Sequence, residues 1–258
     1  MSADNSMDAP EKKLFADRVI VITGAGGLIG RALALGFLND GAYVVGVGRK
    51  AEPLEDMFRP YSSQVMCLEA DLSEVKACTE VIDTICRQMG RIDVLVNAAG
   101  LSGAGNFLEV ELRQWVDTFA VNLLSVAACS YAALPGMIRR RHGRIVNFGT
   151  RLSMRCRTGL AAYAVSKNAM SSLTRALAKE LRAEHPYILV NDIIPGLTRA
   201  EAINGAQRPE AVYPSVRDMV LLEDGTRSGQ VYFRGHWYEY SSSFDPVDPA
   251  GPDQMPLA

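Results

Sequence analysis

The sequence predicts an α/β fold in which about seven strands form a parallel sheet that helices cover on both faces. Short apolar runs that suit buried strands alternate along the chain with longer segments of helical periodicity. The 258 residues, 48% of them hydrophobic, supply enough apolar side chains for one large core, and no repeat or linker divides them. Strands that alternate with helices in this way pair in parallel, because each helix carries the chain back across the sheet.

Composition narrows the classes of function. A net charge of −2 argues against nucleic acid as a partner. We expect no membrane partner and a cytoplasmic location, because no apolar run reaches roughly 18 residues and the N-terminus lacks the apolar core of a secretory signal. The five cysteines form no Cys-x-x-Cys pair and the three histidines are scattered, so no metal site is expected.

The expected organisation has three parts. Residues 1–14 are polar at first and carry no periodicity, which predicts a flexible N-terminal arm. Residues 15–240 form the single domain. Residues 241–258 are rich in Ser, Pro and Asp, which predicts an extended C-terminal tail.

The first strand and helix enclose a glycine-rich turn. The apolar run Val19–Ile22 leads into residues 23–30, and a helical pattern continues to Leu38. Glycines let the backbone turn sharply and let a diphosphate approach the helix N-terminus, whose N–H groups favour negative charge. A tight turn with a structural role only is the alternative interpretation.

The second strand, 43–47, indicates which dinucleotide is bound. It ends at Gly48-Arg49-Lys50, where an acidic residue would be expected if the site bound a free adenosine ribose. The planar guanidinium of Arg49 could hold a 2′-phosphate instead, so NADP(H) is favoured and NAD(H) is possible. Alternatively, Arg49 is only a solvated residue at a strand end.

The next two strands, 65–69 and 92–96, end at Asp71-Leu72 and at Asn97-Ala98-Ala99-Gly100, with a helix over 73–89 between them. Small residues after the carboxyl end of a strand leave room for a ligand there. A long helix is predicted over 112–141, and Asn122 in its middle either caps a local kink or holds water.

The basic run 139–144 spans a helix end and a turn. Cations are favoured at a helix C-terminus, so we expect a stabilising end and not a nucleic-acid site. A fifth strand, 145–148, leads to Gly149-Thr150 and a loop over 151–160.

A helix predicted from the end of that loop to about residue 182 carries Tyr163 and Lys167. Residues four apart share one face of a helix, where an ammonium could hold a phenol ready to ionise. A sixth strand, 188–194, ends at Pro195-Gly196-Leu197-Thr198, before an irregular stretch over 199–214, a helical piece near 216–222 and a last strand over 230–233.

Taken in this order and spacing, the glycine-rich turn, Asn-Ala-Ala-Gly, Asn122, Thr150, Tyr163, Lys167 and Pro195-Gly196 resemble the short-chain dehydrogenase/reductase family, in its single-domain branch. The resemblance covers roughly residues 15–235 and implies a Rossmann-type doubly wound sheet. It implies these cofactor-binding residues: Thr23, Gly24, Gly26, Gly27, Leu28, Ile29, Gly30, Arg49, Asp71, Leu72, Asn97, Ala98, Ala99, Gly100, Tyr163, Lys167, Pro195, Gly196 and Thr198.

The same resemblance implies the catalytic residues. Tyr163 would protonate a substrate carbonyl, or accept the proton in the reverse direction. Lys167 would lower the pKa of the tyrosine and hydrogen-bond the nicotinamide ribose, and Asn122 would hold a water that joins Lys167 to solvent. Thr150 stands where the family has serine, so it keeps the hydroxyl and narrows the pocket by a methyl; Ser153 ranks second for that role.

Other departures from the family pattern concern the cofactor. Leu28 occupies the position of a family glycine, and Ala98 replaces an asparagine. Ala200 stands where a threonine is frequent, which leaves Thr198 as the nearer candidate.

The implied function is NAD(P)H-dependent reduction of a ketone to a secondary alcohol, or the reverse. The alternatives are a catalytically silent dinucleotide-binding regulator or partner subunit, and an epimerase or lyase that acts through transient oxidation. Arg151, Arg155 and Arg157 would favour a carboxylate or phosphate on the substrate if they face the cleft; otherwise they are solvated or contact a subunit. The family also implies a homodimer or homotetramer packed through the helices that carry Asn122 and Tyr163.

Overall fold

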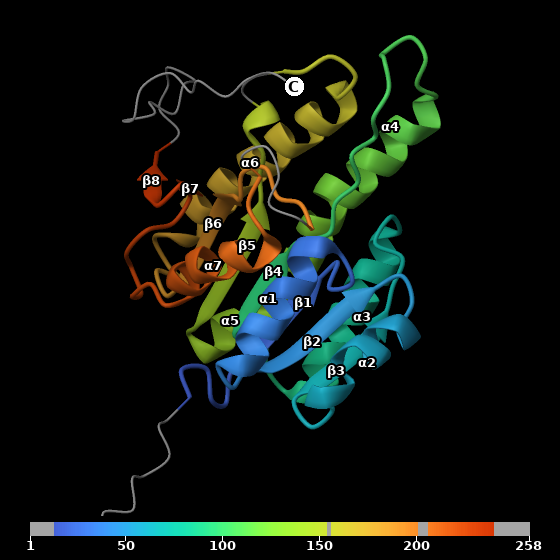
Figure 1. The fold of residues 1–258 in the computed structure, drawn as a ribbon. Helices are drawn as coiled ribbons and strands as arrows, with labels where there is room; N and C mark the ends of the chain where they lie inside the picture. Colours follow the sequence, from blue (N-terminus) through green and yellow to red (C-terminus); the bar gives the residue numbers. More distant parts are fainter. Residues whose placement is uncertain (1–12, 154–155, 201–205, 240–258) are drawn as a thin grey trace, which may run out of the picture.

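The structure is a computed structural model that describes residues 13–153, 156–200 and 206–239 (Figure 1). The expected C-terminal tail and all of the N-terminal arm except Lys13 and Leu14 lie outside the described residues, as does Arg155. The proposed domain boundaries therefore stay predictions.

One sheet of eight strands in the order β3-β2-β1-β4-β5-β6-β7-β8 confirms the α/β prediction. Neighbouring strands are parallel from β3 to β7, and β8 pairs with β7 antiparallel. The strands are β1 (Val19–Thr23), β2 (Tyr43–Gly48), β3 (Val65–Glu69), β4 (Val94–Asn97), β5 (Gly143–Phe148), β6 (Ile188–Ile194), β7 (Val231–Phe233) and β8 (His236–Tyr238).

Strand β8 was not predicted from the sequence. It follows β7 after Arg234 and Gly235, whose positive φ angles of 50° and 84° are those of a two-residue hairpin turn. A three-residue strand gives too little alternation of apolar and polar residues to be recognised by pattern.

The helices cover both faces of the sheet, as predicted (Figure 1). One buried cluster joins the sheet to α3, α5 and α6, and the other joins it to α1, α2 and α7. Side chains along β1 alternate between the two clusters, because successive residues of a strand point to opposite faces. The helices are α1 (Leu28–Asn39), α2 (Glu52–Phe58), α3 (Val75–Met89), α4 (Leu112–Phe119), α5 (Ser125–Arg140), α6 (Ala161–Leu181) and α7 (Tyr213–Val220).

The helical run Leu112–Arg140 is long and apolar enough to cross a membrane by length and composition alone. Half of its most apolar window is buried inside the fold, and α5 contributes Cys129, Ala133 and Met137 to the core. A core helix meets the same criterion, so this feature is weak support for a membrane span.

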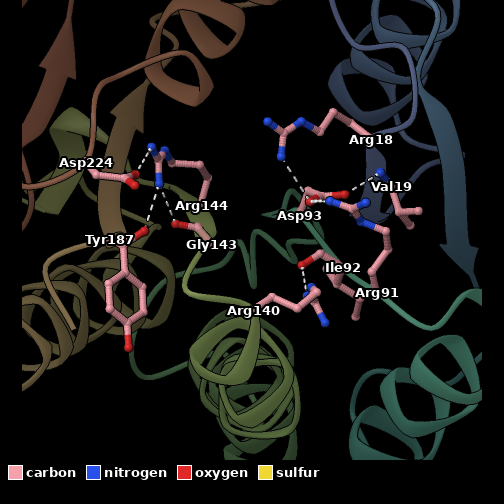
Figure 2. Close-up of polar contacts among 10 residues, drawn as sticks. All are labelled: Arg18, Val19, Arg91, Ile92, Asp93, Arg140, Gly143, Arg144, Tyr187 and Asp224. Carbon is pink, nitrogen blue, oxygen red and sulfur yellow. Dashed lines mark hydrogen bonds and ion pairs between the residues drawn. The ribbon is translucent and has the colours of Figure 1, made fainter. Parts of the chain in front are cut away.

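Two groups of charged residues tie the amino ends of the central strands together (Figure 2). In the first, the Asp93 side chain, which is 1% exposed, accepts hydrogen bonds from the Val19 N–H at 2.8 Å, from Arg91 at 2.5 Å and from Arg18 at 3.3 Å. Burial alone would raise the pKa of Asp93, but these hydrogen bonds and the two guanidinium charges lower it below its usual value.

The second group corrects part of the interpretation of the basic run 139–144 as a helix end and a turn. Arg139 and Arg140 do lie in the last turn of α5, where Arg140 donates to the Ile92 carbonyl. Arg144 instead lies within β5 with its side chain buried, and donates to the Gly143 and Tyr187 carbonyls and to Asp224 (Figure 2). The strand therefore begins at Gly143, two residues before the predicted start, and includes Arg144.

We predict that Asp93→Asn destabilises the fold by about 3 kcal/mol, because it leaves two arginines beside a buried amide. The lowered pKa means that this contribution is present above the unfolded carboxyl value and is lost as the pH falls below it. Urea unfolding at pH 7 and at pH 3 measures both effects. As a control, Glu80→Gln breaks an exposed ion pair with Lys76 and should change stability by less than about 0.5 kcal/mol; equal effects of the two variants contradict the prediction.

Candidate active site

The glycine-rich turn after β1 packs against the segment after β4. At Gly24, whose φ is 68°, an added Cβ would lie 2.7 Å from the Ala99 Cα. At Gly30 it would lie 2.2 Å from the Gly24 carbonyl oxygen, whereas at Gly26 and Gly27 the nearest atoms are 3.2 Å away. Close packing therefore requires glycine at two positions of the turn, and the turn and the Asn-Ala-Ala-Gly segment form one surface.

The N-terminus of α1 opens onto this surface. Its N-cap residue Gly27 provides no side-chain cap, and its first turn contains no acidic residue. Free N–H groups at such a helix end suit an anion, which fits the diphosphate of a dinucleotide. Leu28, at the position of the family glycine, is 45% exposed beside it, while Thr23 is buried and its hydroxyl accepts from the Ala99 N–H at 3.3 Å.

Arg49 and Asp71 come together at the carboxyl ends of β2 and β3, and both are exposed. Hydrogen bonds from the Ser73 N–H and hydroxyl lower the pKa of Asp71, and the nearby Arg49 charge lowers it further. Leu72 is buried beneath them. The structure thus brings Arg49 and Asp71 together at neighbouring strand ends, one strand away from the turn.

A chain of buried hydrogen bonds that the sequence analysis missed runs beneath this edge. The Asn97 side-chain amide donates to the Asn147 Oδ1 at 2.8 Å, and the Asn147 side-chain amide donates to the Thr174 hydroxyl at 2.9 Å. The Thr174 hydroxyl lies 2.5 Å from a carboxylate oxygen of Asp192. The signal available in the sequence was the presence of Asn147 and Asp192 inside otherwise apolar strands, although their partners are distant in sequence.

Asn122 lies in a π-helical turn, Ala120–Leu124, that separates α4 from α5. The predicted single helix is therefore interrupted, and a local distortion at Asn122 was one of the two expected explanations. Its amide donates to the Leu101 carbonyl at 2.8 Å and to the Ser166 hydroxyl at 2.9 Å, and its oxygen accepts from the Leu101 N–H at 2.8 Å. Asn122 thus joins the loop after β4 to α6.

Lys167 is buried on α6, with only 4% of its surface exposed. A Cβ added at Gly100 would lie 3.8 Å from the Lys167 Nζ and 3.5 Å from the Asn122 Oδ1, so Gly100 leaves these two groups open toward the edge of the sheet. Burial lowers the pKa of Lys167 to about 8, although the negative charge of Asp192 acts in the opposite direction. The lysine therefore titrates near neutral pH.

The Tyr163 phenol lies one helical turn before Lys167 and hydrogen-bonds the Thr150 hydroxyl. Burial raises the pKa of Tyr163 above its usual value, and the hydrogen bond from Thr150 offsets part of this increase. The phenol consequently carries its proton at neutral pH. Thr150 also accepts from the Leu152 N–H at 3.3 Å, which holds the start of the following loop.

The remaining candidates lie around the same edge. Pro195-Gly196 follows β6, with a φ of 78° at Gly196, and Thr198 bridges to Gln207, which also donates to the Pro195 carbonyl. The Arg151 guanidinium lies over the Phe233 ring of β7 at 5.4 Å, and Arg157 is exposed. The backbone of Ser153 lies in a short 3-10 helix, but its side chain is outside the described residues.

The described residues contain no group of three or more His, Cys, Asp or Glu side chains that could hold a metal ion.

A doubly wound parallel sheet with a glycine-rich turn between β1 and α1 defines a Rossmann-type protein, the class that binds dinucleotides at the carboxyl ends of its strands. The model of the short chain dehydrogenase family matches residues 18–211. The chain therefore belongs to this family of oxidoreductases, as the resemblance implied.

Relatives and solved structures agree with this assignment. A 2,3-dihydro-2,3-dihydroxybenzoate dehydrogenase from Bacillus subtilis (strain 168) is 35% identical over 187 residues, 71% of this chain and 71% of the relative. A meso-2,3-butanediol dehydrogenase from Serratia marcescens is 32% identical over 192 residues, 74% of this chain and 75% of the relative. The crystal structure of a metagenomic short-chain oxidoreductase in complex with NADP matches with a TM-score of 0.76 and 28% identity, over 85% of this chain and 97% of that one.

We predict that Gly30→Ala destabilises the fold by about 2 kcal/mol or more, because its Cβ has no room beside the Gly24 carbonyl. Gly26→Ala is the matched control in the same turn, since its Cβ would meet only the Leu54 side chain at 3.2 Å, and it should cost less than about 1 kcal/mol. Urea unfolding of both variants measures the difference. If the two costs are the same, steric demand does not explain the placement of glycine.

Proposed function

We propose that this protein is an NADP(H)-preferring oxidoreductase that reduces a ketone to a secondary alcohol, or catalyses the reverse reaction, with Tyr163 as the general acid or base. The observation that carries the proposal is the hydrogen bond between Tyr163 and Thr150, one helical turn from the buried Lys167. A proton donor, a second hydroxyl and a cation at one strand edge are the groups that carbonyl reduction requires.

Each of these residues has a distinct part in the reaction. In reduction, the protonated Tyr163 donates its proton to the developing alkoxide, while the Thr150 hydroxyl hydrogen-bonds the same oxygen. The Lys167 ammonium stabilises the phenolate that remains. In oxidation, the phenolate accepts the alcohol proton. Asn122 fixes the loop and helix that hold these groups, and the water it would hold is the proposed route from Lys167 to solvent.

The dinucleotide fits the surface formed by the glycine-rich turn and the Asn-Ala-Ala-Gly segment. Its nicotinamide supplies or accepts the hydride. The uncapped N-terminus of α1 would hold the diphosphate, and Asp71 and Leu72 would border the adenosine. Pro195, Gly196 and Thr198 would border the nicotinamide end.

We predict that Tyr163→Phe lowers kcat for reduction of a cognate ketone by at least about a hundredfold, because it removes the transferred proton. Binding of NADPH, measured by quenching of the intrinsic fluorescence, should stay within about twofold. The substrate is found beforehand by screening ketones and alcohols with both cofactors. Undiminished turnover in this variant contradicts the proposed mechanism, whereas NADPH binding without turnover of any screened compound favours the silent regulator or partner subunit.

The preference for NADP(H) is proposed from Arg49, which stands exposed at the end of β2 beside Asp71. The NADP complex of the metagenomic oxidoreductase supports the choice by analogy. The Ser73 N–H and hydroxyl already donate hydrogen bonds to the Asp71 carboxylate, so Asp71 does not depend on Arg49 for a donor. The planar guanidinium of Arg49 could therefore hold a 2′-phosphate.

We predict that Arg49→Ala weakens binding of NADPH by about tenfold or more and leaves binding of NADH within about twofold, because only NADPH carries the 2′-phosphate. Titration of each dinucleotide with the purified protein measures the two constants. Lys50→Ala, which removes the neighbouring cation, should have the smaller effect. An unchanged NADPH constant in Arg49→Ala would exclude this arginine from the phosphate site.

The substrate is proposed to be a small molecule that enters beside Thr150. The names of the two relatives, a butanediol dehydrogenase and a dihydrodihydroxybenzoate dehydrogenase, support a hydroxylated substrate. Arg151, Arg157 and Ser153 are the proposed substrate contacts. The Phe233 ring lies under Arg151 and, at 5.3 Å, under Arg234, so two cations flank this side of the edge and favour a substrate with a carboxylate or phosphate.

The protein is proposed to be cytoplasmic. It is also proposed to form a homodimer or homotetramer, because its long helices carry exposed apolar side chains. Leu112 and Val116 project from α4, Leu124 and Tyr131 from the π turn and α5, and Val165 from α6. Apolar side chains gathered on helices that also carry Asn122 and Tyr163 are typical of an interface between copies.

A further inference from the structure

Asp192 is a buried acidic residue close to the proposed catalytic lysine that the mechanism above does not use. It lies in β6 with no exposed surface, next to Asn147 of β5 in the register of the sheet. Burial of a carboxylate carries a large desolvation cost unless hydrogen bonds or an opposite charge compensate for it. Its surroundings therefore have to supply that compensation.

The hydrogen bonds around Asp192 favour the ionised carboxylate. Thr174 lies two helical turns after Lys167 on α6, and its hydroxyl is 2.5 Å from the Asp192 Oδ1, a separation typical of a hydroxyl that donates to a carboxylate. The Thr174 oxygen in turn accepts from Asn147, which accepts from Asn97. The Asn97 and Asn147 amides and the shorter hydrogen bond of the Thr174 hydroxyl point toward Asp192, so each of these bonds strengthens the next one. The longer contact of that hydroxyl reaches the Met170 carbonyl at 3.3 Å.

Among the described residues, Asp192 is the one whose charge acts on the pKa of Lys167. The described elements that pack around α6 are α4, the π turn, the 3-10 helix after β5, β5 and β6. Arg113 and Asp117 of α4 pair with each other at 2.8 Å, and Arg151 lies over Phe233. Arg144 of β5 pairs with Asp224 at 2.7 Å. Tyr163 is protonated at neutral pH because burial raises its pKa.

We propose that Asp192 is the buried counter-charge of Lys167, which keeps the ammonium protonated and thereby makes Asp192 a positioning residue for proton transfer at Tyr163. In a medium of low dielectric, one carboxylate acts over a longer distance than it would in water. The inference rests on the proposed function for its catalytic consequence, but the effect of Asp192 on Lys167 is a property of the protein alone.

The pH dependence follows from the direction of each effect. Burial already lowers the pKa of Lys167 to about 8, with Asp192 opposing the decrease. Without the carboxylate the pKa of Lys167 falls further, and the lysine is then neutral over more of the neutral range. Ketone reduction, which uses the charged lysine, loses activity as the pH rises through the pKa of Lys167. Without Asp192 this alkaline loss should therefore begin at a lower pH.

The test is the titration of Lys167 in the dinucleotide-free protein. The chain has six lysines, so the ¹³C-labelled Cε signals can be resolved, and the Lys167 signal is identified by its absence in Lys167→Arg. In Asp192→Asn the pKa of Lys167 should fall by about one unit, and the alkaline limb of kcat/KM for reduction should move down with it.

Asp93→Asn is the matched control, because it makes the same substitution in a buried carboxylate at the opposite edge of the sheet. It should lower stability without moving the Lys167 titration. If Asp192→Asn does not fold, Thr174→Val keeps the carboxylate but removes its donor, and a smaller shift in the same direction is expected.

An unchanged Lys167 titration in the folded Asp192→Asn variant, or in Thr174→Val if only that variant folds, would overturn the inference. An equal shift in Asp93→Asn would also overturn it, because the effect would then reflect lost stability. These outcomes are independent of the Tyr163→Phe assay, so failure of the proposed reaction and failure of the counter-charge are distinguishable.

Discussion

Burial of the Lys167 ammonium is the constraint on which the rest of the site depends. A lysine with 4% of its surface exposed keeps its charge only if nearby groups compensate for the water it has lost. Gly100 leaves the Lys167 Nζ open toward the strand edge, because it has no side chain there. The negative charge of Asp192 raises the pKa of Lys167 and so opposes the effect of burial. The lowered pKa shows that compensation is incomplete, which suits a group that takes part in proton transfer.

The glycine-rich turn and the π turn both position the loop that follows β4. Both bring backbone from different strand ends together at one edge, the first by excluding a side chain at Gly24 and Gly30 and the second by turning Asn122 toward Leu101. The loop after β4 is held from both sides, since Ala99 packs on the first turn and Leu101 bonds to the second. The surface proposed for a dinucleotide and the groups proposed for proton transfer are therefore joined by the loop after β4.

Sequence patterns predicted the parts of this protein whose signals are local. The six parallel strands from β1 to β6, the helix with Tyr163 and Lys167, and the turn at Gly24–Gly30 each follow from periodicity or from a short motif. Asn122 in an apolar helix also indicated a local distortion, which the π turn provides. The hairpin at Arg234 was missed because β8 is only three residues long, and the burial of Arg144 was missed because its partners Tyr187 and Asp224 are far away in sequence. The chain from Asn97 to Asp192 was missed for the same reason: its four members come from β4, β5, α6 and β6, and only the fold brings them together.

The two buried aspartates of the sheet, Asp93 and Asp192, differ in their hydrogen-bond partners and in their proposed roles. Asp93, at the amino edge, is bonded directly by two arginines and a backbone N–H, and this full pairing lowers its pKa and fixes the starts of the strands. Asp192, near the carboxyl edge, is bonded by a neutral hydroxyl, and the cation it acts on lies farther along α6. The Thr174 hydroxyl favours the charged form of Asp192, and in a medium of low dielectric that charge acts beyond its own hydrogen bond. The charge at the amino edge thus holds strand ends together, whereas the charge at the carboxyl edge is proposed to act on a lysine one helical turn from the tyrosine.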